Sequence, residues 1–213
     1  MRTHPFLAGL TATCTAALLL GAGPVQAQSN DLASWAAAGD GLIGNSIAAA
    51  TLSTASLASG ETPLSGHSAL LYDALEPALG LAIGTLAADT YEGSGLAQTF
   101  TVSTPTRVRF DWVLASSEAF DAGFADRALV IVDGVALRPL GELAASPVSG
   151  SFDITFALPG SHSLALVLMD VNDSAGLSTL ALSGFAVSAV PEPAGCALLL
   201  LGLGLLGGLR RRR

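Results

Sequence analysis

The chain has 213 residues, half of them hydrophobic, which is enough for one folded domain with further segments at its ends. Its 17 acidic residues outnumber its nine basic residues, all of them arginines, and give a formal net charge of −8. This balance argues against binding to nucleic acid or to an anionic membrane surface, since both attract basic proteins.

The first 27 residues have the organisation of a secretory signal peptide. Arg2 supplies the positive start, residues 6–20 form an apolar stretch, and Val25-Gln26-Ala27 places small residues where signal peptidase needs them. Cys14 raises the alternative of a lipoprotein, but it lies inside the apolar stretch and follows Thr13. The sequence therefore predicts export, with cleavage between Ala27 and Gln28.

Residues 28–189 are predicted to form the folded domain. Both cysteines, Cys14 and Cys196, lie outside it, so the domain has no disulfide and must be held by its core. Residues 28–190 contain four arginines against 16 acidic residues, which gives this part of the chain a net charge of −12.

The first third of the domain is rich in small residues and gives weak signals. Residues 43–54 are compatible with a pair of strands, and residues 70–79 with one short helix. Pro77 is expected to interrupt that helix, because proline removes a hydrogen bond and clashes with the preceding turn.

The rest of the domain reads as a series of strands separated by turns. Along residues 107–114, Val108, Phe110, Trp112 and Leu114 alternate with polar residues, as expected for a strand with one buried face. Asp133-Gly134 lies between two apolar runs and predicts a hairpin with a type I′ turn. The predicted strands are 98–102, 107–114, 128–132, 135–137, 151–158, 163–169 and 179–187. This pattern favours an all-β, antiparallel β-sandwich over an alternating α/β fold.

The last 24 residues, 190–213, carry the most specific signal. Pro191 and Pro193 exclude a helix at this point, and Glu192 between them is held extended. Residues 194–209 contain only Ala, Gly, Cys and Leu. As a helix they would reach roughly 24 Å, somewhat less than a hydrocarbon core of about 30 Å, and arginines that snorkel to the interface can make up the difference. We therefore expect a C-terminal transmembrane helix followed by a cytoplasmic basic stop, with the domain outside. The basic stop consists of Arg210, Arg211, Arg212 and Arg213.

This arrangement resembles the PEP-CTERM sorting signal of Gram-negative bacteria that make exopolysaccharide. The resemblance implies a transient anchor in the inner membrane, export by the secretion machinery, and cleavage by the membrane protease exosortase near Pro191, Glu192 and Pro193. It further implies delivery to the cell surface or the extracellular matrix. The alternative is a plain membrane anchor that is never processed.

A second resemblance concerns the domain, which is similar to the jelly-roll domains common in PEP-CTERM proteins. These are similar in architecture to carbohydrate-binding modules, but jelly rolls host unrelated functions. The segments that carry this resemblance are Asn30, Trp35, Gly39-Asp40, 94–102, 110–112, Ser117-Glu118, Asp126, 132–134, Asp173, Ser178, Leu180 and 185–187.

Two loops concentrate acidic residues and suggest a structural calcium ion, because calcium takes six to eight oxygen ligands, mostly from carboxylates and carbonyls. The spacing excludes an EF-hand, and the same residue types are also what ordinary turns use. No cofactor is therefore certain, and the alternatives of a calcium site and plain turns stay open. The candidate ligands are Glu118, Asp121, Asp126, Asp170, Asn172 and Asp173.

An exposed aromatic ring could serve as a platform for a sugar. Tyr91, next to Glu92 and Gly93, is the first candidate and Trp35 the second, while Trp112 is expected in the core. For both candidates the alternative is an ordinary packing role.

Nothing in the sequence predicts catalysis. His67 and His162 lie apart, with no His-Glu-x-x-His spacing, and there is no Gly-x-Ser-x-Gly motif. We expect a non-enzymatic surface or matrix protein that associates with exopolysaccharide and not with nucleic acid. A calcium-dependent carbohydrate-binding module is the alternative. A surface glycoside hydrolase would need Glu118 and Asp126 to face each other across a cleft.

Overall fold

The computed structural model of the chain describes residues 31–44, 48–86, 88–117, 123–142, 147–174 and 176–190. The predicted signal peptide with its Ala27–Gln28 cleavage site lies outside these residues. So do the Pro191–Pro193 motif, the expected transmembrane helix at 194–209 and the basic stop at 210–213. In the part of the chain that is described, no helix has the length and apolarity to cross a membrane.

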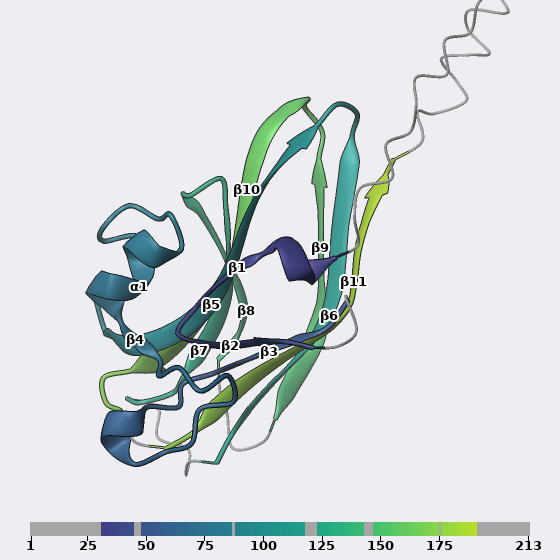
Figure 1. The fold of residues 1–213 in the computed structure, drawn as a ribbon. Coiled ribbons are helices and arrows are strands. Elements are labelled where there is room, and N and C mark those ends of the chain that lie inside the picture. Colours follow the sequence, from purple (N-terminus) through teal and green to yellow (C-terminus); the bar gives the residue numbers. More distant parts are fainter. Residues whose placement is uncertain are drawn as a thin grey trace, which may run out of the picture.

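The domain is a sandwich of two antiparallel sheets, as the sequence predicts (Figure 1). One sheet has the strand order β1-β5-β10-β7-β8, with β4 paired to β5, and the other has the order β2-β3-β11-β6-β9. From β5 onwards the chain passes repeatedly from one sheet to the other, which gives a jelly-roll-like path. The elements are η1 (Leu32–Ser34), β1 (Ala36–Ala38), β2 (Asp40–Ile43), β3 (Ala50–Ser53), η2 (Leu57–Ser59), β4 (Leu70–Leu71), α1 (Tyr72–Ala78), β5 (Thr90–Val102), β6 (Thr106–Ser116), β7 (Arg127–Val132), β8 (Ala136–Glu142), β9 (Val148–Phe156), β10 (Gly160–Val171) and β11 (Ser178–Ala189).

The main core lies between the two sheets and is built from alternate residues of the long strands. The four apolar residues predicted to face inward from β6 are all buried there. Trp112 is one of them, and it packs against positions that have no side chain. A Cβ atom built at Gly150 on β9 would lie 2.9 Å from the Trp112 ring, and one at Gly141 on β8 would lie 3.0 Å from it.

A second, smaller core covers the outer face of the β5-containing sheet. Leu75 and Leu79 of the α1 region pack on β5 at Gly93 and Gly95, where an added Cβ would lie 3.2 Å from Leu75 and 2.7 Å from Leu79. Bare glycines in β5 thus let the helix approach the strand closely. Pro77 does not break this helix, contrary to the prediction. It removes one hydrogen bond, to the carbonyl of Asp73, and Asp73 is exposed to water.

The hairpin predicted at Asp133-Gly134 is confirmed, since both residues have positive φ, 53° and 73°, as a type I′ turn requires. Of the strand pair predicted within residues 43–54, β3 lies in that range, but its partner β2 ends at Ile43 and so precedes the range almost entirely. Strand β5 starts at Thr90, eight residues before the predicted start at 98, because its glycines resemble turn residues in the sequence.

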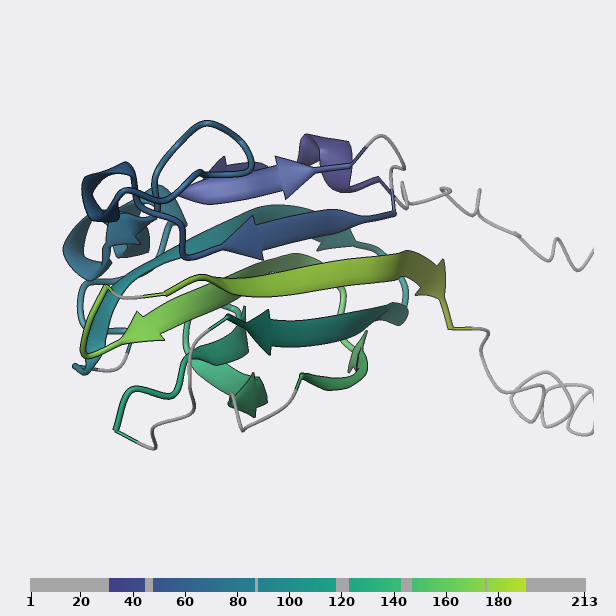
Figure 2. The same ribbon diagram turned by 90° about the horizontal axis from the view of Figure 1, so that it is seen from below.

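The two ends of the sandwich differ (Figure 2). We call the end that holds α1, the start of β11 and the end of β10 the acidic end, because Glu92, Asp126 and Asp170 lie there. The end from which the chain leaves β11 towards the C-terminus is called the exit end; it holds the β5–β6, β7–β8 and β9–β10 turns. Residues 188–190 are compatible in sequence with a short flexible spacer, but Ser188 and Ala189 pair with β6, and the Val190 amide donates to the Pro105 carbonyl over 2.7 Å.

Candidate functional site at the acidic end

Neighbouring strands bring buried carboxylates together at the acidic end. In the register of β10 and β7, Met169 lies opposite Arg127. Asp126 directly precedes β7, so it comes beside Asp170, the next residue of β10, and both side chains are buried. The amide of Val171 donates to Asp126 Oδ1 over 3.1 Å. Glu92 lies on the other side of β10, on β5, and all three acidic residues are buried. The site therefore combines candidate residues that the sequence places more than 40 positions apart.

The Asp126 carboxyl is in an environment that disfavours its charge. Burial raises its pKa above the ordinary value, the hydroxyl of Ser178 and the amide of Val171 oppose that shift, and the negative charge of Asp173 adds to it. The second oxygen, Oδ2, makes no hydrogen bond of ordinary geometry with any described residue, and neither does the Ser178 hydroxyl. The Ser178 hydroxyl therefore lies near the Asp126 carboxyl without making a well-formed hydrogen bond to its Oδ2 atom.

Glu92 was not predicted as a site residue, and its pKa is also raised. Burial, followed by repulsion from Glu61, raises its pKa from 4.5 to about 7. Its Oε1 atom has no hydrogen-bond partner among the described residues. The sequence signal for it was an acidic residue between Tyr91 and Gly93, at a position that continues the inward face of Leu96 and Ser94.

The remaining calcium candidates divide into two groups. Asn172 has a φ of 65°, and its side-chain amide donates to the Gly123 carbonyl over 2.8 Å, so it stabilises the loop. Asp173 acts on Asp126 through its charge. Glu118 and Asp121 lie outside the described residues, so the pairing of Glu118 with Asp126 that a hydrolase would need stays a prediction. Across the described segments, no three His, Cys, Asp or Glu side chains form a group that could hold a metal ion.

Two further buried acids, which were not predicted as site residues, fix the loops at this end. Asp40 accepts from the amides of Leu64 and Ser65 over 2.8 and 2.7 Å, and also from the Ser53 hydroxyl. Glu76 accepts from the amides of Gly84 and Leu86 over 2.8 and 2.7 Å. Both are isolated acids among small or apolar residues, which is the sequence signal that could have revealed them.

The two candidate aromatic platforms have different environments. The Tyr91 side chain is 44% exposed, and Tyr72, the residue after β4, is exposed to a similar degree. Strand β4 ends with Leu71 paired to Glu92, the neighbour of Tyr91. Trp35 is only 6% exposed and makes an edge-to-face contact with Phe185, with ring centroids 5.2 Å apart. For Trp35 the structure therefore shows the alternative of an ordinary packing role, because the distant residue Phe185 covers its ring.

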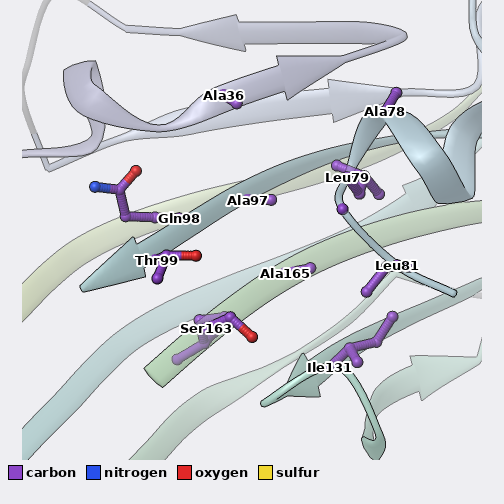
Figure 3. Close-up of a pocket in the computed structure, with 12 residues that line it drawn as sticks. Ala36, Ala78, Leu79, Leu81, Ala97, Gln98, Thr99, Ile131, Ser163 and Ala165 are labelled. Atoms are coloured by element: carbon purple, nitrogen blue, oxygen red, sulfur yellow. The ribbon is translucent and has the colours of Figure 1, made fainter. Parts of the chain in front are cut away.

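A cavity of about 300 Å³ lies on the outer face of the β5-containing sheet, next to the end of α1 (Figure 3). Small side chains of Ala36, Ala97 and Ala165 form its floor, and Leu79 and Leu81 lie beside them. None of its twelve lining residues is charged or aromatic, so it offers few groups that could orient a polar ligand.

His162, at the exit end, is the histidine with the most polar contacts. Its Nδ1 lies 3.1 Å from Asp133 Oδ2, its Nε2 lies 3.0 Å from the Leu158 carbonyl, and its ring packs on Phe156. These contacts, the Leu158 carbonyl first, raise its pKa. Both ring nitrogens are thus engaged, Nδ1 by Asp133 and Nε2 by the Leu158 carbonyl, so neither is available to activate a nucleophile in this arrangement, and the residue connects two turns.

Comparison with known proteins places the clearest match at the C-terminus. Residues 189–213 match the PEP-CTERM protein-sorting motif. This match implies that the chain is exported, transits the membrane and is processed by exosortase. No curated protein matches the chain.

Several solved structures are similar to this chain in fold at low identity. The structure of TmCBM61 in complex with beta-1,4-galactotriose is 12% identical, covers 76% of this chain and 92% of its own, and has a TM-score of 0.33. The N-terminal cellulose-binding domain of Cellulomonas fimi beta-1,4-glucanase C is 15% identical, covers 75% and 90%, and has a TM-score of 0.29. A cyclase from Fischerella sp. TAU is 13% identical, covers 75% and 86%, and has a TM-score of 0.32.

Proposed function

We propose that this protein is a non-enzymatic component of the bacterial surface or extracellular matrix, which exosortase releases from a transient inner-membrane anchor and which then associates with exopolysaccharide. The observation that carries the proposal is the sorting motif at 189–213, which follows the last strand of a complete β-sandwich without a break. A folded module that continues directly into a sorting segment is organised for delivery to the surface.

The test is to follow the full chain in a host that has exosortase and in the same host without it. We expect the wild-type protein to lose its C-terminal segment only where exosortase is present, and Glu192→Gln to yield at least tenfold less processed protein. Intact mass and fractionation of membrane, surface and medium would measure both. Asp73→Asn, which neutralises an exposed carboxylate on α1, is the matched control and should be processed like the wild type.

Two results would contradict this proposal. One is wild-type protein that stays unprocessed in the exosortase host, and the other is a Glu192→Gln variant that is processed at the wild-type rate. The association with exopolysaccharide has its own test. In a host that cannot make exopolysaccharide, the processed protein should move from the surface fraction into the medium.

A calcium-dependent carbohydrate-binding module is the second candidate function. The observation that favours it is the pair Asp126 and Asp170, which are adjacent, buried and on the same end of the sandwich as the exposed Tyr91 ring. A cation beside Asp126 would offset the cost of burying its charge. In this second proposal Asp126 and Asp170 would supply oxygen ligands together with Glu118 and Asp121, which lie outside the described residues, and Tyr91 would supply a face for a sugar.

A further inference from the structure

The length of chain between the sandwich and the expected membrane segment limits where the domain can lie. The last described hydrogen bond joins the Val190 amide to the Pro105 carbonyl, and the apolar run begins at Ala194. Four residues span at most about 14 Å when fully extended. The headgroup layer on one side of a bilayer is itself roughly 5–8 Å thick. The exit end must therefore lie at the headgroups while the anchor is in the membrane.

The turns that surround this exit point expose apolar side chains. Thr106 pairs with both Ala189 and Phe156, so the start of β6 separates the end of β11 from the β9–β10 turn by one strand. His162 connects that turn to the β7–β8 turn. Leu158 in the first turn is 73% exposed and Val135 in the second is 79% exposed. Such residues at turn tips are suited to the interface between water and lipid.

The charged residues, like the apolar ones, favour an orientation with the exit end at the membrane. The turns at the exit end, residues 103–105, 133–135 and 157–159, contain one ionisable residue, Asp133, and His162 contacts it. The acidic end contains Glu61, Asp73, Glu92, Asp126 and Asp173. A domain with a net charge of −12 would be repelled by anionic lipid, and this arrangement keeps most of that charge away from the bilayer.

We propose that, before processing, the exit end of the sandwich is seated on the membrane surface, with Leu158 and Val135 in the lipid headgroup layer and the acidic end pointing away. This inference rests on the proposed function, because it requires the C-terminal segment to be inserted. It adds an interaction surface on the domain itself, and its partner is the phospholipid bilayer.

The experiment uses the full chain, purified from a host without exosortase so that the C-terminal segment is kept, in vesicles of phosphatidylethanolamine and phosphatidylglycerol that contain spin-labelled quencher lipids. Single cysteines carry an environment-sensitive dye in a background of Cys14→Ser and Cys196→Ala. The test position is Leu158→Cys. The matched control is Ile83→Cys, also apolar and 83% exposed, in the loop that follows α1 and outside the turns of the exit end. The native Cys196, labelled in a chain that keeps it, reports on insertion of the anchor.

We expect quenching at positions 196 and 158 to be at least threefold stronger than at 83, with a blue-shifted emission at 158. Quenching at 196 but not at 158 would overturn the seating and leave the proposed function intact. A lack of quenching at 196 would overturn both. Quenching at 158 that appears only when exosortase is added to the vesicles would also overturn it, since the surface would then bind the protease and not lipid. Both substituted positions are exposed, and an unchanged melting temperature would confirm that each variant folds.

Discussion

At the scale of single residues, His162 couples two turns through contacts that depend on its protonation. Only the imidazolium can donate from both ring nitrogens, to Asp133 and to the Leu158 carbonyl. Because folding raises its pKa above 6.5, the contribution is complete below that value and is lost as the pH rises through the higher pKa of the folded state.

We expect this contact to make thermal stability fall with rising pH. An exposed ion pair contributes at most about 1 kcal/mol, or roughly 2–4 °C in melting temperature for a domain of this size. All proteins in this experiment carry Glu92→Gln, because the raised pKa of Glu92 gives a loss of stability in an overlapping pH range. In this background, the melting temperature should fall between pH 6 and 9 by that amount more when His162 is present than in the His162→Gln variant. The exposed His67→Gln is the control, and equal slopes in all three proteins would contradict the assignment.

At the scale of elements, the contact of Trp112 with Gly150 ties β6 to the edge strand β9. Gly150→Ala would put a methyl group 2.9 Å from the indole, and overpacking of this kind costs about 1–3 kcal/mol. We expect the melting temperature to fall by several degrees. Ser149→Ala, on the exposed face of the same strand, should change it by less than about 1 °C. A Gly150→Ala variant as stable as the wild type would show that Trp112 can move aside.

Elements with strict alternation could be predicted from sequence, and elements shaped by distant contacts could not. Strand β6 buries the four apolar residues predicted to face inward because they alternate with mostly polar residues. The start of β5 was missed because Gly93 and Gly95 serve the packing of α1, which no local pattern reveals. At the candidate site, Asp126 and Asp170 were predicted from turn composition. Glu92 was not, because its burial depends on strands that the sequence keeps far apart.

At the scale of the whole molecule, the concentration of acid at one end has a consequence for cation binding. The second candidate function predicts that calcium raises the melting temperature of the processed protein relative to EDTA. At 100 times the dissociation constant the stabilisation would be about 2.7 kcal/mol, a shift of several degrees. The shift should be larger at pH 8 than at pH 6, because the pKa values of Asp126 and Glu92 are raised and a bound cation must displace protons.

Asp126→Asn is expected to abolish the calcium effect, and Asp73→Asn on the exposed surface of α1 to preserve it. If calcium leaves the wild-type protein unchanged, the acidic loops are turns, and the second candidate function fails while the first stands.

The position of β11 also sets the order of events during export. It is the central strand of its sheet, between β3 and β6, yet it is the last strand in the chain. When the chain is exported with its N-terminus first, the edges of β3 and β6 that pair with β11 stay unpaired until residues 178–189 have crossed the membrane. Unpaired strand edges are sites of mispairing. The sheet can close only when the sorting segment that follows β11 has reached the membrane. Completion of the fold and arrival at the sorting step therefore coincide in time.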